Sequence, residues 1–98
     1  MIFLIATLRI RPGSFAAVIE AVKPCLVATR LEQGCLSYDL HVNVTDPEEL
    51  VFIERWESQA ALDAHFETPH LKAWRTAGGP HMVSRKIEII HPERVDAR

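Results

Sequence analysis

Residues 2–10, IFLIATLRI, alternate as a β-strand does and are apolar on both of the resulting faces. Ile2, Leu4, Ala6, Leu8 and Ile10 share one face, and Phe3, Ile5 and Thr7 share the other. A strand that is apolar on both faces usually lies in the middle of a sheet and is covered on both sides. We therefore expect this segment to be a central strand.

An amphipathic helix of about five turns is expected after Ser14, a residue type that favours the N-cap position. Its apolar side spans an arc of about 100° at helical spacing and comprises Phe15, Val18, Ile19, Val22, Leu26 and Thr29. Pro24 should kink or split this helix, because proline removes a backbone donor. Gly34 is the expected stop at its C-terminal end.

A β-hairpin is expected next. Residues 35–44 alternate between apolar and polar side chains, and residues 50–57 form the returning strand. The residues between them, Thr45-Asp46-Pro47-Glu48-Glu49, are rich in turn-forming types. The two strands should therefore be joined by a loop of about five residues.

Two helices and a last strand complete the pattern. Ser58 is the expected N-cap of one helix, and Thr68-Pro69 resembles a fresh start for a short helix over 70–77. Residues 82–90 form the last strand.

The resulting order is β-α-β-β-α-β, the ferredoxin-like arrangement of the α+β class. Right-handed crossovers would place the helices on one face of a four-stranded antiparallel sheet. We expect one domain over 1–92 and a charged, frayed tail over 93–98. The other face of the sheet would be bare, yet Val51 and Ile53 on its third strand are apolar. A bare apolar face predicts a partner, most simply a second copy in a two-fold homodimer.

Composition argues against several classes of protein. The chain has 98 residues, a net charge of −2 and no basic block, which argues against a nucleic-acid partner. It contains no apolar run of about 18 residues, as a membrane span requires. The apolar start lacks the features of a signal peptide, so we expect a cytoplasmic protein. Cys25 and Cys35 match no zinc spacing and are expected to be small buried side chains.

Four short segments are characteristic in combination: RIRPG at 9–13, EQGCLSY at 32–38, ERWE at 54–57, and AALDAH at 60–65 followed by Pro69-His70. Together they resemble the antibiotic-biosynthesis monooxygenase family of the dimeric α/β-barrel superfamily. The resemblance spans residues 2–91, nearly the whole chain.

The resemblance implies a barrel-like homodimer with a pocket between the sheet and the helices of each subunit. Characterised members oxidise quinols, phenols or anthrones with dioxygen, without a metal or flavin. We therefore expect a cofactor-independent monooxygenase acting on a small electron-rich aromatic. The same scaffold also hosts isomerases and haem-degrading enzymes, and a non-catalytic stress protein that binds a small ligand is a further alternative.

His65 and His70 are candidate catalytic residues. His65 points inward on the apolar side of its helix, either as a core histidine or as a base or hydrogen-bond donor to a phenolic oxygen. The resemblance favours the second role. His70 either faces solvent or joins His65 at one end of the pocket. A helix break separates the two, unlike the i, i+4 pair of a helical zinc site, so no metal is expected.

Tyr38 is the third catalytic candidate. It shares a strand face with Leu36 and Leu40, so its phenol should be buried and need a partner, either a substrate oxygen or a carboxylate. Glu54 lies on an otherwise apolar face, where a carboxylate is costly unless it is paired. Its partner would be Arg85 or Arg9; otherwise Glu54 would have a raised pKa and act as a base.

Aromatic side chains are the remaining candidates for substrate binding. Trp56 and Trp74, together with Tyr38, would suit a flat aromatic substrate by stacking, although an aromatic at the position of Trp56 is more often part of the core. Phe66 is a further candidate for substrate binding. The histidines His41, His81 and His91 are expected on exposed strand faces or loops and are given no role.

Overall fold

A four-stranded antiparallel sheet forms one layer of the protein, and three helices form the other. The computed structural model describes residues 1–98. The strands are β1 (Ile2–Ile10), β2 (Cys35–Asn43), β3 (Asp46–Trp56) and β4 (Met82–Ile90), in the spatial order β2-β3-β1-β4. The helices are α1 (Phe15–Arg30), α2 (Gln59–Phe66) and α3 (Pro69–Gly78), with a short 3₁₀ turn η1 (Gly79–His81) before β4.

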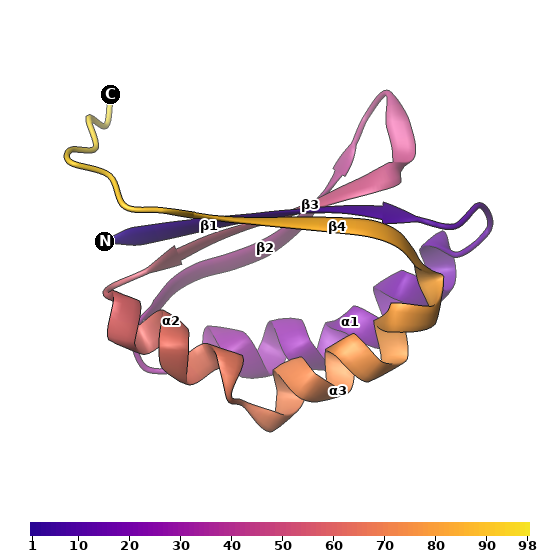
Figure 1. Ribbon diagram of the computed structural model, residues 1–98, viewed down its shortest axis with the longest axis horizontal. Coiled ribbons are helices and arrows are strands. Elements are labelled where there is room, and N and C mark those ends of the chain that lie inside the picture. The colour runs from indigo at the N-terminus through magenta and orange to yellow at the C-terminus, as the bar shows by residue number, and fades with distance from the viewer.

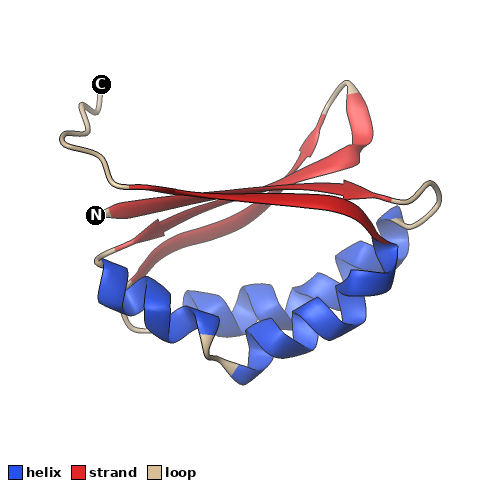
Figure 2. Cartoon of the chain, in the orientation of Figure 1, coloured by secondary structure: helices blue, strands red, loops and turns tan.

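All three helices cover the same face of the sheet (Figures 1 and 2). The predicted ferredoxin-like fold is confirmed, and β1 is a central strand between β3 and β4. None of the helices has the length and apolar character that crossing a membrane would require. Residues 91–98, beyond β4, contain no helix or strand.

The core lies between the sheet and the helices. Leu4, Ala6 and Leu8 of β1 face this layer, and the sheet register places each of them beside an inward residue of β3. The opposite, outer face has no helical cover. Its apolar residues Phe3, Ile5, Val51 and Ile53 are partly exposed. The sheet is thus buried on one side and bare on the other.

Helix α1 runs unbroken through Pro24, so of the two expected effects, a kink or a split, the split does not occur. Pro24 and Glu20, whose carbonyl loses its helical donor, both lie on the exposed side. Water can satisfy that carbonyl, and the buried side keeps its packing. That side consists of Val18, Val22, Cys25 and Thr29.

Gly34 does not stop α1, because the helix already ends at Arg30 with Leu31 as its C-cap. Gly34 has a φ of +85°, and a Cβ atom built on it would lie 2.5 Å from the Cβ of Ala61 on α2. The Gly34 carbonyl also accepts a 2.8 Å hydrogen bond from the backbone N–H of Glu57. Gly34 therefore allows the loop after α1 to pass tightly against α2.

The hairpin loop is shorter than expected, because β3 begins at Asp46 and only Val44 and Thr45 lie between the strands. Side-chain bonds specify this turn. The Asn43 side-chain oxygen accepts from both the backbone N–H (3.0 Å) and the hydroxyl (2.9 Å) of Thr45. Asp46 pairs with Arg9 of β1. Because of these contacts, most of the predicted turn, from Asp46 onward, belongs to strand β3.

The helix starts at α2 and α3 follow the predicted pattern. Ser58 is the N-cap of α2, and its side chain accepts a 3.1 Å hydrogen bond from the backbone N–H of Ala61. Pro69 opens α3 after Thr68. The Thr68 hydroxyl donates to the carbonyl of His65 at 2.8 Å, which fixes the turn between the two helices. This turn brings the start of α3 back beside the end of α2.

Candidate functional site

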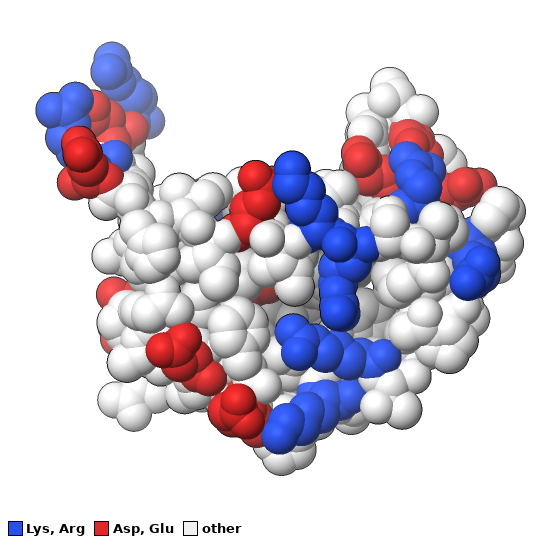
Figure 3. Space-filling view, viewed as in Figure 1, with Lys and Arg blue, Asp and Glu red and all other residues white.

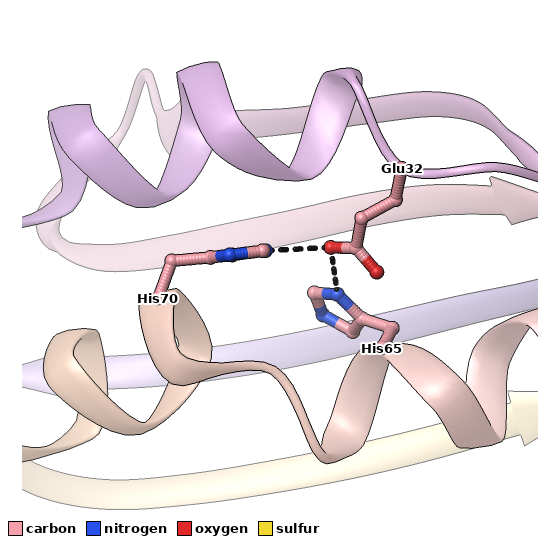
Figure 4. Close-up of side chains that lie close together, drawn as sticks. All are labelled: Glu32, His65 and His70. Carbon is pink, nitrogen blue, oxygen red and sulfur yellow. Dashed lines mark hydrogen bonds and ion pairs between the residues drawn. The ribbon is translucent and has the colours of Figure 1, made fainter.

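One carboxylate oxygen joins two histidines beneath the sheet (Figure 4). Oε2 of Glu32 lies 2.7 Å from Nδ1 of His65 and 2.7 Å from Nε2 of His70. Glu32 comes from the loop after α1, His65 from the last turn of α2, and His70 from the first turn of α3. The tight passage at Gly34 and the turn at Thr68 bring these three segments together.

The hydrogen bond to Glu32 determines which nitrogen of His65 is free. A carboxylate only accepts, so Nδ1 of His65 carries the proton and Nε2 keeps its lone pair. Nε2 makes no hydrogen bond to the protein. His65 is 1% exposed, and this burial lowers its pKa below the usual 6.5 although the Glu32 carboxylate opposes the shift. His65 is therefore neutral near pH 7 and can accept a proton.

Trp56 supports His65 from behind. The centroids of the indole and imidazole rings lie 4.7 Å apart, and Trp56 is fully buried. Its Nε1–H donates a 3.0 Å hydrogen bond to Glu54. Trp56 therefore does not line the pocket described below; it holds His65 and Glu54 in place.

The same three side chains are also potential metal ligands. One donor atom each from Glu32, His65 and His70 lies within 4.8 Å of the others. Two histidines and one carboxylate are a common ligand set for divalent iron and related ions. The expectation of no metal considered only the spacing of the histidines, whereas the third candidate ligand comes from a distant loop.

A small pocket with a cavity volume of about 40 Å³, partly open to solvent, lies between the sheet and helices α2 and α3. Nine of its 13 lining residues are hydrophobic. The lining comprises Leu4, Ala6, Leu8, Tyr38, Phe52, Glu54, His65, Phe66, Leu71, Trp74, Arg75, Arg85 and Ile87. A largely apolar pocket with a few polar groups is the usual form of a small-molecule site.

Glu54 is the acidic residue of this pocket. Burial raises its pKa from the usual 4.5 to about 7, and the hydrogen bond from Trp56 only partly offsets this. Neither arginine expected as its partner forms an ion pair with it, because Arg9 pairs with Asp46 and Arg85 makes no ion pair. Glu54 is thus held by an indole N–H and can carry a proton near neutral pH.

Tyr38 lines the pocket with its ring and not with its hydroxyl. The hydroxyl lies 3.6 Å from Sγ of Cys25 on α1, and Cys25 in turn lies 3.6 Å from the hydroxyl of Thr29. Burial raises the pKa of the Tyr38 phenol well above its usual value. The partner of Tyr38 is therefore a thiol, and neither a substrate oxygen nor a carboxylate is needed to satisfy it.

Comparison with known proteins identifies the family. The family described as "Antibiotic biosynthesis monooxygenase" matches residues 1–77. The chain belongs to this family. The resemblance seen in the sequence is thereby confirmed.

The probable quinol monooxygenase YgiN of Escherichia coli is 33% identical over 102 residues, covering 94% of this chain and 98% of YgiN. The putative monooxygenase Rv0793 of Mycobacterium tuberculosis is 35% identical over 79 residues, covering 81% of this chain and 76% of its own. The solved structure of Rv0793 matches with a TM-score of 0.89 at 30% identity and covers 98% of each chain.

Within this family fold, the predicted site residues fall into two groups. His65, Tyr38, Glu54, Phe66 and Trp74 line the pocket, whereas Trp56 and His70 are not among its lining residues. His41 and His91 are exposed, and His81 bonds through Nδ1 to the Ser14 hydroxyl at 2.9 Å.

Three residues were missed as site residues: Glu32, Arg75 and Arg85. Glu32 lies in the EQGCLSY segment, but nothing in the sequence showed that it reaches two histidines. Nothing in the sequence singled out Arg75, since successive helix positions point in different directions.

Proposed function

We propose that this protein is a cofactor-independent monooxygenase that oxidises a small electron-rich aromatic, such as a quinol, phenol or anthrone, with dioxygen. The observation that carries the proposal is the His65 imidazole, which is oriented by Glu32 and lines an apolar pocket. The name of the E. coli relative, a probable quinol monooxygenase, supports the substrate class.

The first step is proton removal from the substrate hydroxyl by Nε2 of His65. As the imidazole gains this proton, its positive charge is stabilised by the Glu32 carboxylate 2.7 Å from Nδ1. His70, bonded to the same oxygen, holds that carboxylate in position. The resulting phenolate is electron-rich enough to transfer an electron to dioxygen, so the aromatic substrate supplies the reducing power itself.

The pocket would provide the remaining requirements. Phe52 and Trp74, whose ring centroids lie 6.2 Å apart, form an edge-to-face aromatic wall for a flat substrate. Protonated Glu54 could donate a hydrogen bond to a developing oxyanion. The apolar lining excludes water, which strengthens these interactions and protects reactive intermediates.

The proposal includes a homodimer formed through the outer face of the sheet, because apolar Phe3, Ile5, Val51 and Ile53 remain partly exposed there. It also includes a cytoplasmic location, where Cys25 and Cys35 would stay reduced, as both are free thiols. The partners are then a second copy of the chain, the aromatic substrate and dioxygen.

Dioxygen uptake by chelator-treated protein tests the function. A panel of quinols and anthrones is compared with an autoxidation blank, using wild type, His65→Ala and the control His41→Ala on the exposed side of β2. We expect uptake above the blank that falls at least about a hundredfold in His65→Ala and is unchanged in His41→Ala.

Two results would count against the proposal. The first is dioxygen uptake that requires added Fe²⁺ or Mn²⁺ and is lost both in Glu32→Gln and in His70→Ala. This result would show that Glu32, His65 and His70 form a metal centre. Binding of the aromatic compounds without any turnover would instead favour a ligand-binding protein.

A further inference from the structure

Two arginines at the mouth of the pocket have no partner within the protein. Arg75 lies on α3 and Arg85 on β4, so they approach the mouth from opposite layers. Neither takes part in any hydrogen bond or ion pair. The other arginines, apart from the terminal Arg98, each have one: Arg9, Arg11, Arg30, Arg55 and Arg94. The two pocket arginines are thus available to a ligand.

A second, smaller hollow with a cavity volume of about 30 Å³ adjoins the pocket at these arginines. The two hollows share Leu8, Trp74, Arg75 and Arg85, so both arginines border both hollows. His65 lines only the first hollow, while Gly79 and Met82 line only the second. A ligand with one end at His65 would therefore meet both arginines along its length.

The local charge is opposite in sign to that of the whole chain. The net charge is −2, yet Figure 3 shows basic side chains gathered in a band across the middle of the face that carries β4 and α3. Glu54 is the one acidic residue among the lining residues of the two hollows. It lies deep, 4% exposed and bonded to Trp56, and it forms no ion pair with either arginine, although the charge of Arg75 slightly opposes the rise in its pKa.

We propose that Arg75 and Arg85 form an anion subsite, and that the substrate is a hydroxylated aromatic that carries a carboxylate. The hydroxyl lies at His65, the ring lies against Phe52 and Trp74, and the carboxylate lies between the two guanidinium groups. A guanidinium presents paired N–H donors that match a carboxylate, which makes arginine specific for such planar anions. The placement of the substrate hydroxyl at His65 rests on the proposed function, whereas the anion subsite is inferred from the two arginines alone.

Binding of a matched pair of probes tests the subsite without requiring turnover. A hydroxynaphthoate and the naphthol that lacks its carboxylate are titrated by calorimetry into wild type, Arg75→Gln, Arg85→Gln and the double variant. The controls are Lys86→Gln, on β4 but on its outer face opposite Thr7, and Lys72→Gln on α3. Each control removes one positive charge from the same element.

We expect wild type to bind the hydroxynaphthoate at least about tenfold more tightly than the naphthol, as charge-assisted hydrogen bonds allow. Each arginine variant should lose most of this preference, and the double variant all of it, with naphthol binding unchanged. The lysine controls should keep it. Because Arg75 and Arg85 are exposed and unpaired, the variants should fold normally.

Equal affinity of wild type for both probes, or equal losses in the lysine controls, would overturn the anion subsite. The outcomes also separate this inference from the proposed function. Carboxylate-dependent binding with no dioxygen uptake would leave the subsite standing and remove the monooxygenase. Dioxygen uptake with no preference for the carboxylate would do the reverse.

Discussion

Glu32 is the residue that gives His65 its chemistry. One of its two carboxylate oxygens, Oε2, accepts hydrogen bonds from both histidines. Glu32 therefore fixes the tautomer of His65 and partly offsets the lowering of the His65 pKa by burial. An orienting carboxylate behind a catalytic histidine is a common arrangement, because it stabilises the imidazolium that forms. His70 acts on His65 through Glu32, which it holds in place, and its proximity also contributes to lowering the pKa of His65.

Glu32→Gln should lower the pKa of His65 further, because the carboxylate that favours its charged form is gone. NMR titration of the histidine Cε1–H signals measures this, with His65 assigned by its loss in His65→Ala. We expect His65 to titrate below 6.5 in wild type and lower still in Glu32→Gln. Glu67→Gln at the end of α2 is the control. An unchanged or raised pKa would show that Glu32 does not set the charge of His65.

Glu54 should make the protein less stable as pH rises. Its pKa is raised from 4.5 to about 7, so between these values the folded state holds a proton that the unfolded state has lost. The free energy of unfolding therefore falls as pH rises through this window, by about 3 kcal/mol in total. Glu54→Gln keeps an oxygen acceptor for Trp56 and should remove this slope.

Urea unfolding at several pH values, with Glu57→Gln as the exposed control at the end of the same strand, measures the slope. Parallel pH profiles for wild type and Glu54→Gln would mean that Glu54 titrates at its usual pKa in the folded protein.

At the scale of elements, the hydrophobic periods were enough to predict the strands and helices. Segments 2–10 and 82–90 match β1 and β4 exactly in extent, because apolar alternation has no competing local signal there. Prediction failed where hydrogen bonds between neighbouring side chains determine the backbone conformation, as at the Asn43–Thr45 turn. It also failed where a tertiary contact determines the role of a residue, as at Gly34. Glu32 was missed for a similar reason, since its partners lie 33 and 38 residues further along the chain.

Gly34→Ala should destabilise the protein more than Gly13→Ala does. Both glycines have positive φ, +85° and +81°, so both substitutions cost about 1–2 kcal/mol in backbone strain. Only Gly34 meets a neighbour, because its Cβ would lie 2.5 Å from that of Ala61, whereas nothing lies within 4 Å at Gly13. The additional cost at Gly34 is therefore steric, of order 1–3 kcal/mol.

The double variant Gly34→Ala with Ala61→Gly separates the two costs by urea unfolding. It should recover the steric part and leave the strain, after allowing for the cost of Ala61→Gly alone. Equal losses at Gly34 and Gly13 would show that the loop and α2 are not in tight contact, and would weaken the account of how Glu32 reaches His65.

At the scale of the whole molecule, one sheet face has no cover. Helices α1, α2 and α3 all lie on the opposite face, which leaves the outer face of β1 and β3 open (Figure 2). On that face Ile53 lies between Ile5 of β1 and Asp39 of β2. The apolar part therefore runs along the central strands and is bordered by polar groups, which is the composition of an interface and not of a solvated surface.

We expect light scattering at micromolar concentration to give about twice the 11.1 kDa chain mass, as a two-fold dimer requires. Ile53→Asp should yield a monomer, because it places an unpaired carboxylate in the centre of the proposed dimer interface. The monomer should still fold, because the side chain at this position points away from the core. Val44→Asp, at the 95% exposed tip of the hairpin, should remain a dimer. A monomeric wild type would contradict this interface.

The same variant shows whether one subunit is sufficient for binding. If Ile53→Asp is monomeric yet binds the hydroxynaphthoate as wild type does, each subunit carries a complete site. This is the expected result, because all the proposed binding residues lie on the helical side of a single sheet. If binding is lost with the dimer, the pocket needs the second copy to hold β4, whose Ile87 at the pocket wall is 40% exposed in the single chain.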